Sequence, residues 1–421
     1  MNNNVRFDLS DYLIHFFRDI DLTSSNGIVF PEHMGWQNLY EDVSFPAIFM
    51  LRAALRNGRL WATWSIRGDK RTIYGYDPAI CFTEMPIAAF LEAGYKRWSS
   101  GQAMSPYALI FPRKELFNLG ARPVISGLST GGNIYSHQDE EGNRLLPENS
   151  LPFNEQYRYI TFDISNSRNI DWTHEREWRW PYRGDISKLT SEMEKFGCVS
   201  NWYDIPGMDF YRCGLTGLGV IVKTTEQADL VVSDILTLVD GEQVSFNTFG
   251  FILISDLLPT TDKLMDPSCI TSAINSAMID LSPYFSLSVE KCYEYDYLFT
   301  ELVKKVSSDV DMDIYDGDIG GCWLWLHNNT SELTRALLNT GRFFVSTDGR
   351  YLANLPEFSS LIDLQKREDM VSTLSELVNN KFGTSSCYFS VLNSNNPSDV
   401  PFYVDNKIDD NIPFFNCSWN Y

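Results

Sequence analysis

Residues 171–181 carry more potential chemistry than any other stretch of this 421-residue chain. They read Asp-Trp-Thr-His-Glu-Arg-Glu-Trp-Arg-Trp-Pro, with two glutamates, two arginines, a histidine and three tryptophans. Because side chains alternate along a strand, we expect Glu175 and Glu177 to share one face while Trp178 points to the other. Two carboxylates beside aromatic surface can form a catalytic edge. A salt-bridged structural strand is the alternative, since runs of charge are usually structural.

The segments around this stretch must position it, and their patterns predict strands and helices mixed along the chain. A glycine or proline ends several of them, as Gly58 does after the helix expected over 45–57. Residues 129–152 are polar and glycine-rich, which predicts a surface loop. The expected strands are 8–19, 79–86, 107–112, 122–126, 171–181, 218–223 and 249–255, and the expected helices are 45–57, 87–98 and 225–239.

The length of the chain predicts two or three domains. A boundary is expected near 260–267, which gives a first domain over 1–262 and a mixed α/β domain over 263–421. Helices are expected in the second domain at 270–278, 295–306, 331–339 and 367–382. Residues 261–421 hold 11 Lys+Arg against 23 Asp+Glu, so this part is about twice as acidic per residue as the rest. The two parts are therefore expected to do different jobs.

Composition excludes several classes of protein. No apolar run approaches the roughly 20 residues needed to cross a bilayer, and the start of the sequence does not resemble a secretion signal, so a cytoplasmic protein without membrane contact is expected. The eight cysteines include no Cys-x-x-Cys pair, which favours reduced thiols over disulfides or a zinc site. Residues 309–318 resemble a calcium loop, but Ile314 and Gly320 stand where glycine and glutamate are required. An acidic turn is favoured, and no metal site is expected.

The net charge of −21 argues against broad electrostatic binding of nucleic acid, although it leaves room for a local basic surface. The most basic density in the chain lies between residues 52 and 71. Its members are Arg52, Arg56, Arg59, Arg67, Lys70 and Arg71, and the last three are our candidates for nucleic-acid contact.

Three segments together resemble a known signature. They are Tyr-Leu-Ile-His-Phe-Phe-Arg at 12–18, Ile-Cys-Phe-Thr-Glu-Met-Pro at 80–86 and His-Glu-Arg-Glu-Trp-Arg at 174–179. In this order they are similar to ADP-ribosyltransferase-like proteins of bacterial phage-defence and toxin–antitoxin loci, including DarT-type and AbiGi-type sequences. The resemblance covers about residues 8–260 and does not extend to 265–421. The sequence departs from the pattern at Phe17, where a small polar residue is expected.

The resemblance implies an α+β fold with an ADP-ribosyltransferase-like split β-sheet core, and it implies NAD as the substrate. Cleavage of the bond between nicotinamide and ribose creates positive charge on the ribose, which a carboxylate stabilises. That acid would be Glu177, and Glu175 would orient or deprotonate the nucleophile. Whether Glu175 or Glu177 is the catalytic acid rests on analogy. The residues implied to bind NAD are His15 and Arg18 on its adenine and pyrophosphate side, with Thr83, Glu84 and either Tyr74 or Tyr76 around the nicotinamide.

Structural alternatives stand beside these roles. A lone histidine in an apolar strand is usually a core residue, Arg18 could pair with Asp19 or Asp21, and Glu84 could cap the helix after Pro86. The leading hypothesis is an NAD-dependent ADP-ribosyltransferase toxin of anti-phage defence that modifies a base of RNA or DNA, with a cognate antitoxin as a partner by analogy. The alternatives are a non-catalytic binding protein on the same fold, an antitoxin or phage sensor, and an NAD glycohydrolase.

Overall fold

The computed structural model describes residues 9–21, 44–67, 70–102, 104–129, 136–164, 170–187, 205–259, 268–308, 317–358, 363–401 and 403–404. The chain forms two compact units. The first consists of Met1–Ala228 and Asn247–Ile279, and the second of Asp229–Phe246 and Asp280–Asn420. The boundary predicted after residue 262 lies outside the described residues. Among the described residues, no helix is both long and apolar enough to span a membrane.

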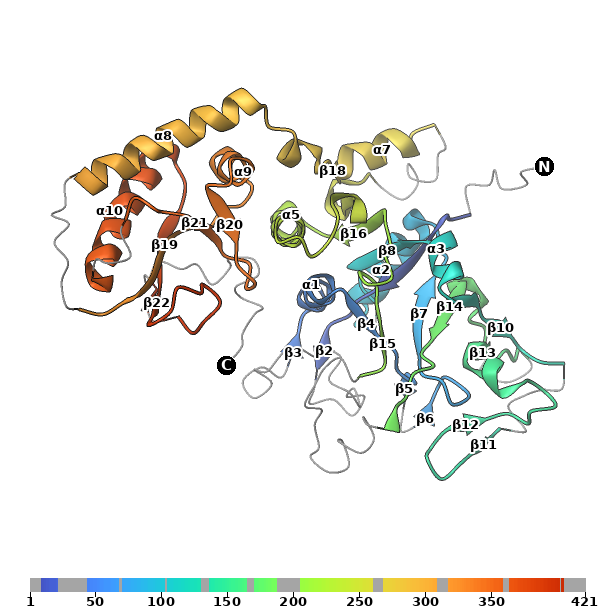
Figure 1. The fold of residues 1–421 in the computed structure, drawn as a ribbon. Helices are drawn as coiled ribbons and strands as arrows, with labels where there is room; N and C mark the ends of the chain where they lie inside the picture. Colours follow the sequence, from blue (N-terminus) through green and yellow to red (C-terminus); the bar gives the residue numbers. More distant parts are fainter. Residues whose placement is uncertain are drawn as a thin grey trace. The chain divides into compact units, whose positions relative to one another are not determined.

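An eight-stranded sheet forms the centre of the first unit (Figure 1). Neighbouring strands are antiparallel except for β16 and β17, which are parallel. In spatial order the strands are β18 (Met278–Ile279), β17 (Phe249–Ile254), β16 (Leu218–Val222), β8 (Ala108–Pro112), β1 (Tyr12–Phe16), β7 (Ala79–Thr83), β14 (Glu177–Pro181) and β9 (Arg122–Pro123). The three segments of the signature therefore lie on adjacent strands, β1, β7 and β14.

Strand register assigns each side chain to a face of this sheet. Thr83 is the partner of Ile14 on one side and of Glu177 on the other, so these three residues share a face. Helix α2 (Ile87–Ser99) packs Phe90 and Leu91 against Ile14 on this side, which we name the α2 face. Alternation then directs the next residue along each strand to the opposite face.

Short elements surround the sheet of the first unit. Helix α1 (Ala47–Asn57) begins after Pro46 and ends at Gly58, whose φ of 63° is in the left-handed region that favours glycine. Helix α3 (Arg113–Asn118) follows β8, and helix α7 (Ile270–Ala277) precedes β18. The remaining strands pair as β2 (Ile20–Asp21) with β3 (Ser44–Phe45), β4 (Arg59–Trp61) with β15 (Gly207–Asp209), β5 (Ile66–Arg67) with β6 (Lys70–Arg71), β10 (Ile125–Ser126) with β13 (Tyr159–Ile160), and β11 (His137–Gln138) with β12 (Arg144–Leu145).

The second unit has a five-stranded antiparallel sheet in the order β20-β21-β19-β22-β23. From β19 to β22 the chain follows the split β-α-β-β-α-β pattern. In chain order, the second unit contains α8 (Val289–Ser308), β19 (Gly320–Leu326), α9 (Glu332–Asn339), β20 (Phe343–Val345), β21 (Tyr351–Ala353), α10 (Leu364–Phe382), β22 (Ser386–Leu392) and β23 (Tyr403–Val404). The side chains of Ser331 and Asp363 cap the first turns of α9 and α10, which explains where both helices begin.

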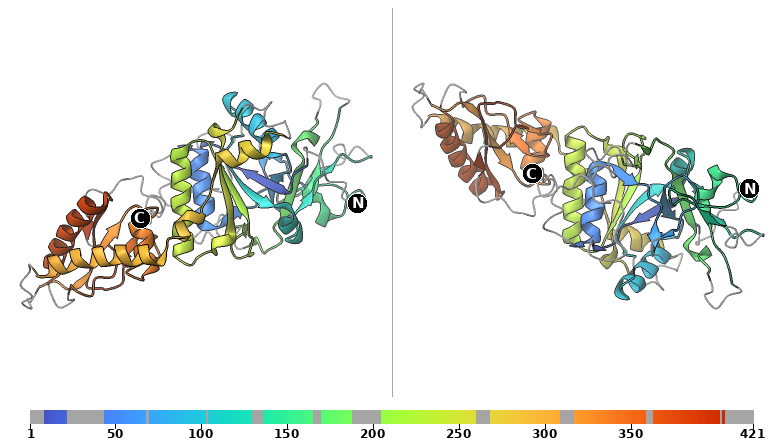
Figure 2. Two further views of the ribbon diagram at one scale, coloured as in Figure 1. Left: turned by 90° about the horizontal axis from the view of Figure 1, so that it is seen from above. Right: turned by 90° about the horizontal axis from the view of Figure 1, so that it is seen from below.

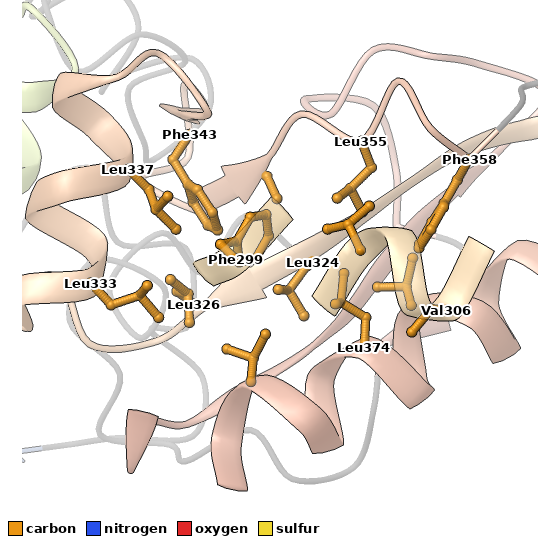
Figure 3. Close-up of a cluster of buried hydrophobic side chains, with 14 of the residues drawn as sticks. Phe299, Val306, Leu324, Leu326, Leu333, Leu337, Phe343, Leu355, Phe358 and Leu374 are labelled. Carbon is orange, nitrogen blue, oxygen red and sulfur yellow. The ribbon is translucent and has the colours of Figure 1, made fainter. Parts of the chain in front are cut away.

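Helices α8, α9 and α10 cover one side of this sheet and close the core of the second unit (Figure 3). Leu324 and Leu326 of β19 contact Phe299 of α8, Leu337 of α9 and Leu374 of α10 within one buried cluster. Burial of such side chains supplies roughly 1.5–3 kcal/mol each. The four helices expected in this half of the chain, over 270–278, 295–306, 331–339 and 367–382, are confirmed.

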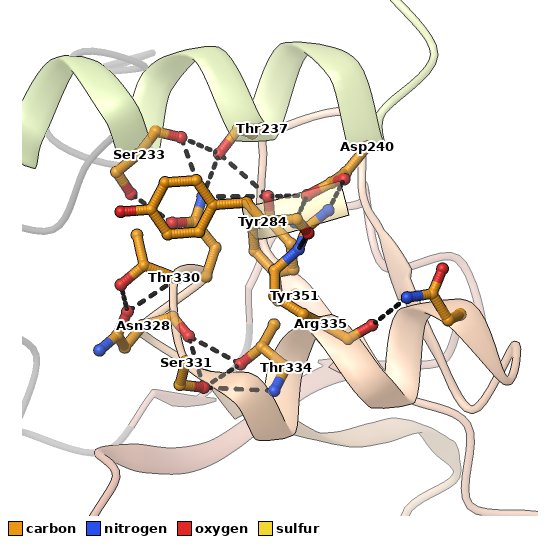
Figure 4. Close-up of polar contacts among 12 residues, drawn as sticks. Ser233, Thr237, Asp240, Tyr284, Asn328, Thr330, Ser331, Thr334, Arg335 and Tyr351 are labelled. Atoms are coloured by element: carbon orange, nitrogen blue, oxygen red, sulfur yellow. Dashed lines mark hydrogen bonds and ion pairs between the residues drawn. The ribbon is translucent and has the colours of Figure 1, made fainter. Parts of the chain in front are cut away.

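Helix α5 (Thr225–Asp240) supplies the second unit with a buried polar network (Figure 4). Arg335 forms an ion pair with Asp240 at 2.5 Å, and the side chains of both residues are 8% exposed. The hydroxyl of Tyr351 donates to Asp240 at 2.7 Å, and Asn329 donates to the hydroxyl of Thr237 at 3.1 Å. Burial and then the charge of Asp240 raise the pKa of Tyr351 well above its usual value, so this phenol remains a donor.

Candidate active site

Strand β14 begins only at Glu177, so the strand predicted over 171–181 is wrong at its start. Thr173–Glu175 is a 3-10 turn, and Arg176 follows it with a φ of 45°. Asp171 fixes this turn because it accepts from the backbone nitrogen of Thr173 at 2.9 Å and from its hydroxyl at 2.6 Å. Local side-chain bonding thus replaces the expected alternation between residues 174 and 176.

The second and third segments of the signature are hydrogen-bonded to each other at several points. The hydroxyl of Thr83 donates to the carbonyl of Glu175 at 2.6 Å, and the backbone nitrogen of Glu84 donates to the carbonyl of Arg176 at 3.1 Å. The indole of Trp178 donates to the Glu84 carboxylate at 2.8 Å. Through these bonds each segment satisfies polar groups of the other.

Glu177 lies on the α2 face next to Thr83, and its side chain is 20% exposed. Arg179 donates through Nε to a Glu177 carboxylate oxygen at 2.7 Å and through a terminal nitrogen to the carbonyl of Tyr157 at 2.6 Å. Arg179 itself is 4% exposed. Burial, followed by the charge of Glu177, raises the pKa of the Cys81 thiol, which therefore stays protonated beside this pair.

Glu175 accepts a hydrogen bond from Arg97, in the last turn of α2, at 2.5 Å. Its carboxylate also lies 3.6 Å from Nε2 of His174, which is 63% exposed in its side chain. The ring of Trp172 packs beside that imidazole, with centroids 6.1 Å apart. Because Glu175 contacts α2, it lies on the same side of the sheet as Glu177. The 3-10 turn places it there, rather than the strand alternation that was expected. Arg97 and Trp172 are site residues that the sequence reasoning missed, because nothing in the spacing of α2 and β14 links them.

The structure does not bring His15 together with Glu177. Register puts His15 on the face opposite Glu177, where its ring packs against Phe17 and Phe82 with centroids 5.1 and 5.8 Å away. Its Nδ1 lies 2.9 Å from the carbonyl of Cys81, which fits an N–H donor. Burial lowers the pKa of His15 to about 4 despite that hydrogen bond, so the ring is neutral near pH 7. His15 therefore packs among aromatic side chains on the face of β1 opposite Glu177, which agrees with the structural alternative.

Thr83 and Glu84 are also occupied by the fold. Thr83 is 3% exposed, and its hydroxyl bridges the carbonyl of Glu175 and the backbone nitrogen of Met85. Glu84 pairs with Arg113 and Trp178 on the face opposite Glu177. The two residues therefore do not line one pocket with Glu177 as expected. Glu84 is not the N-cap of α2 either, since that position is Pro86.

The two candidate tyrosines have different surroundings. Tyr74 is 1% exposed, packs edge-on against Tyr159, and carries the guanidinium of Arg144 over its ring at 4.2 Å, so its ring is already occupied within the fold. Tyr76 is 44% exposed and touches Phe153 edge-on. Arg18 is half-buried after β1, and the Asp19 carboxylate accepts from the backbone nitrogen of Ala47 at 2.8 Å. The expected roles of Tyr76 and Arg18 stay predictions.

The basic segment does not form the single exposed surface that was predicted. Arg71 stacks over Trp64 at 4.1 Å and donates to the side chain of Asn143 and the carbonyl of Glu141. Burial lowers the pKa of Arg71, while Asp139 and Glu141 act in the opposite direction. Arg52 is 8% exposed. Lys70 is exposed, whereas the side chain of Arg67 lies outside what the structure describes.

A cavity of about 700 Å³ opens at the end of the sheet near Trp178. It lies beside the Glu84–Arg113 pair, and it does not include either candidate acid. Its lining consists of Asp11, Tyr12, Pro112, Arg113, Lys114, Glu115, Phe117, Trp178, Thr216 and Gly217. Within the parts of the chain that the structure covers, no group of three or more His, Cys, Asp or Glu side chains could hold a metal ion. Residues 309–316 of the calcium-like loop lie outside those parts.

The site and its sheet define an α+β unit with two arginine-paired acids on one face, followed by a unit of split β-α-β-β-α-β topology. A family model described as "Protein of unknown function (DUF4427)" matches residues 287–417, which fall in the second unit. No curated protein and no solved structure gave a significant match to the chain.

Proposed function

We propose that the first unit is an NAD-dependent ADP-ribosyltransferase whose reactive centre is the acid pair Glu175 and Glu177. The observation that supports this is their shared position on the α2 face, with the Thr83 hydroxyl bonded to the carbonyl of Glu175 and its backbone paired with that of Glu177. The resemblance of the three signature segments to ADP-ribosyltransferase-like proteins supports the choice of NAD. We do not propose ligand contacts for His15, Tyr74, Thr83, Glu84 or Arg71.

The chemistry of the pair follows from charge. As the bond between nicotinamide and the ribose carbon breaks, the electron pair leaves with nicotinamide and the ribose becomes cationic. Glu177, held by Arg179, would stabilise that cation, and Glu175 would accept the proton of the attacking group. Arg97 is the guanidinium closest to Glu175 and is suited to meet the pyrophosphate of NAD.

The acceptor that the resemblance suggests is a base of RNA or DNA, as in anti-phage toxins, and a cognate antitoxin would hold the activity in check. An acceptor surface that includes Lys70 and Arg67 belongs to the same proposal. Since the whole chain carries a net charge of −21, contact with nucleic acid would be local.

A binding protein without catalytic activity is the second candidate, and the surroundings of His15 favour it. The imidazole is held in the core on the other face, and both acids already accept hydrogen bonds from arginines. Such a protein, an antitoxin or a phage sensor, would use the sheet as a scaffold and transfer nothing.

One experiment separates these candidates. The full chain is incubated with NAD labelled in its adenylate part, together with RNA, DNA and protein from cells. Transfer of label that falls by about a hundredfold or more in Glu177→Gln supports the transferase. Glu155→Gln is the matched control, because the Glu155 carboxylate pairs with Arg158, whereas the two acids pair with Arg97 and Arg179. Free ADP-ribose without labelled macromolecule identifies a glycohydrolase. If neither free ADP-ribose nor a labelled macromolecule forms, the result supports the binding protein.

A further inference from the structure

Helix α8 carries three large apolar side chains that the second unit does not bury. Val289, Tyr293 and Tyr297 are 64%, 66% and 63% exposed. Residues four apart lie on the same side of a helix, so these three form one stripe along its first half. The opposite side of α8 supplies Phe299, Val303 and Val306 to the core. Figure 2 shows the length of this helix from two directions.

Such a stripe calls for an explanation that the fold does not give. Single exposed apolar residues are common, but three in line on one helix are typical of a contact surface. Tyr295, on the inner side, packs against the buried cluster and donates to Glu332, so it is occupied. Tyr293 and Tyr297 are not among the side chains packed on that cluster.

Charge along the exposed side of α8 indicates the partner. Glu290 and Glu294 are exposed beside the stripe in its first half, and Lys304 and Lys305 are exposed in the last two turns. Lys304 pairs with Glu301 of the same helix at 3.0 Å, a contact between exposed side chains that other carboxylates can replace. One helix face thus has an acidic end and a basic end.

We infer that α8 pairs with the α8 helix of a second copy of this chain in antiparallel orientation. Glu290 stands seven residues before Tyr297 and Lys304 seven residues after it. A twofold axis at Tyr297 therefore sets Glu290 of each copy opposite Lys304 of the other, and Val289 opposite the aliphatic stem of Lys305. A parallel pair would instead set acid against acid and lysine against lysine.

The two parts of this surface have different roles. Exposed ion pairs contribute little to affinity, so the charges select the orientation while the tyrosines and Val289 supply the binding. Contact through one helix face lies at the small end of specific interfaces. The chain therefore forms a dimer that dissociates on dilution.

Sedimentation of the full chain over roughly a hundredfold range of concentration tests the inference. Tyr297→Lys should weaken association at least about tenfold. Val400→Lys, at another exposed apolar residue of the second unit, should leave it unchanged. Circular dichroism confirms that both variants are folded, which is expected because both side chains are exposed. A chain that is monomeric throughout, or a dimer that Tyr297→Lys leaves intact, overturns the inference.

Charge reversal tests the orientation. One variant carries Glu290→Lys, and another carries Lys304→Glu. Each should self-associate more weakly than the natural chain, because like charges now meet where residue 290 of one copy faces residue 304 of the other. A chain with both substitutions should recover association, since these two positions again carry opposite charges in the antiparallel pair. Failure of the double variant to recover, while the two single variants are weakened, overturns the antiparallel arrangement.

Discussion

The imidazole of His15 and the carboxylate of Glu177 lie on opposite faces of the same β-sheet. Thr83 is the register partner of both Ile14 and Glu177, and His15 is the next residue after Ile14 on β1. A ligand that touches both groups would have to pass through the sheet. The structure therefore does not bring the two groups together in one cleft, contrary to the expectation, and the proposed NAD chemistry is confined to the α2 face.

Substitution of His15 should change stability and its pH dependence. Burial holds the pKa of His15 at about 4, below the 6.5 of an ordinary histidine, so the unfolded chain binds a proton more readily. The stability contributed by the neutral ring is present above pH 6.5 and is lost as the pH falls toward 4, at up to about 1.4 kcal/mol per pH unit. Urea unfolding between pH 7 and 4 should show a shallower dependence in His15→Gln. An unchanged slope would contradict the buried position.

Removal of the indole donor at residue 178 should destabilise the first unit. Trp178→Phe keeps a smaller aromatic ring at this position but takes away the bond to Glu84, and hydrogen bonds to charged groups are worth about 1.5–3 kcal/mol. Thermal unfolding measures this loss. Trp98→Phe is the control, because its indole bonds Asp19 at 3.3 Å in an exposed position, and it should lose less. Equal losses in the two variants would mean that the hydrogen bond from Trp178 to Glu84 contributes no more stability than the exposed bond from Trp98 to Asp19.

The ion pair between Asp240 and Arg335 should be the most sensitive polar contact of the second unit. Both side chains are 8% exposed, so Asp240→Ala leaves a buried guanidinium without its acid and should cost about 3–5 kcal/mol. Lys291→Ala breaks an exposed pair with Glu332 and should cost no more than about 1 kcal/mol. Chemical denaturation of the full chain compares the two variants. A small loss for Asp240→Ala would show that the pair is hydrated in solution.

Substitution of Arg97 tests the paired state of the acids. In Arg97→Ala, Glu175 loses its 2.5 Å partner and keeps only the exposed His174 nearby. If the first unit is a transferase, NAD binding measured by calorimetry should weaken about tenfold while the fold persists. Lys96→Ala is the control, because Lys96 pairs with Glu92 in the same helix on the solvent side. Equal affinity in both variants would exclude Arg97 from the NAD site.

Local patterns predicted most helices and the three signature strands. Gly58 and the prolines before α1 and α2 mark helix ends directly, because these residues restrict the backbone. Register was not predictable, since it depends on which strands become neighbours. For that reason, strand alternation correctly predicted that Glu177 and Trp178 occupy opposite faces of the sheet. It could not predict which of these faces His15 shares. The turn at Thr173–Glu175 was missed because the charge pattern suggested a strand, whereas the hydrogen bonds of Asp171 to Thr173 favour a turn.

Helix α5 interrupts the first unit in the order of synthesis. From Asp229 onward its residues belong to the second unit, yet β17 and β18 of the first sheet are made after it. Asp240 lies 95 residues before Arg335 and 111 before Tyr351, so its partners leave the ribosome much later. A nascent chain must complete one sheet while it holds an unpaired acid for the other. The buried network around Asp240 can therefore close only after synthesis has passed Tyr351.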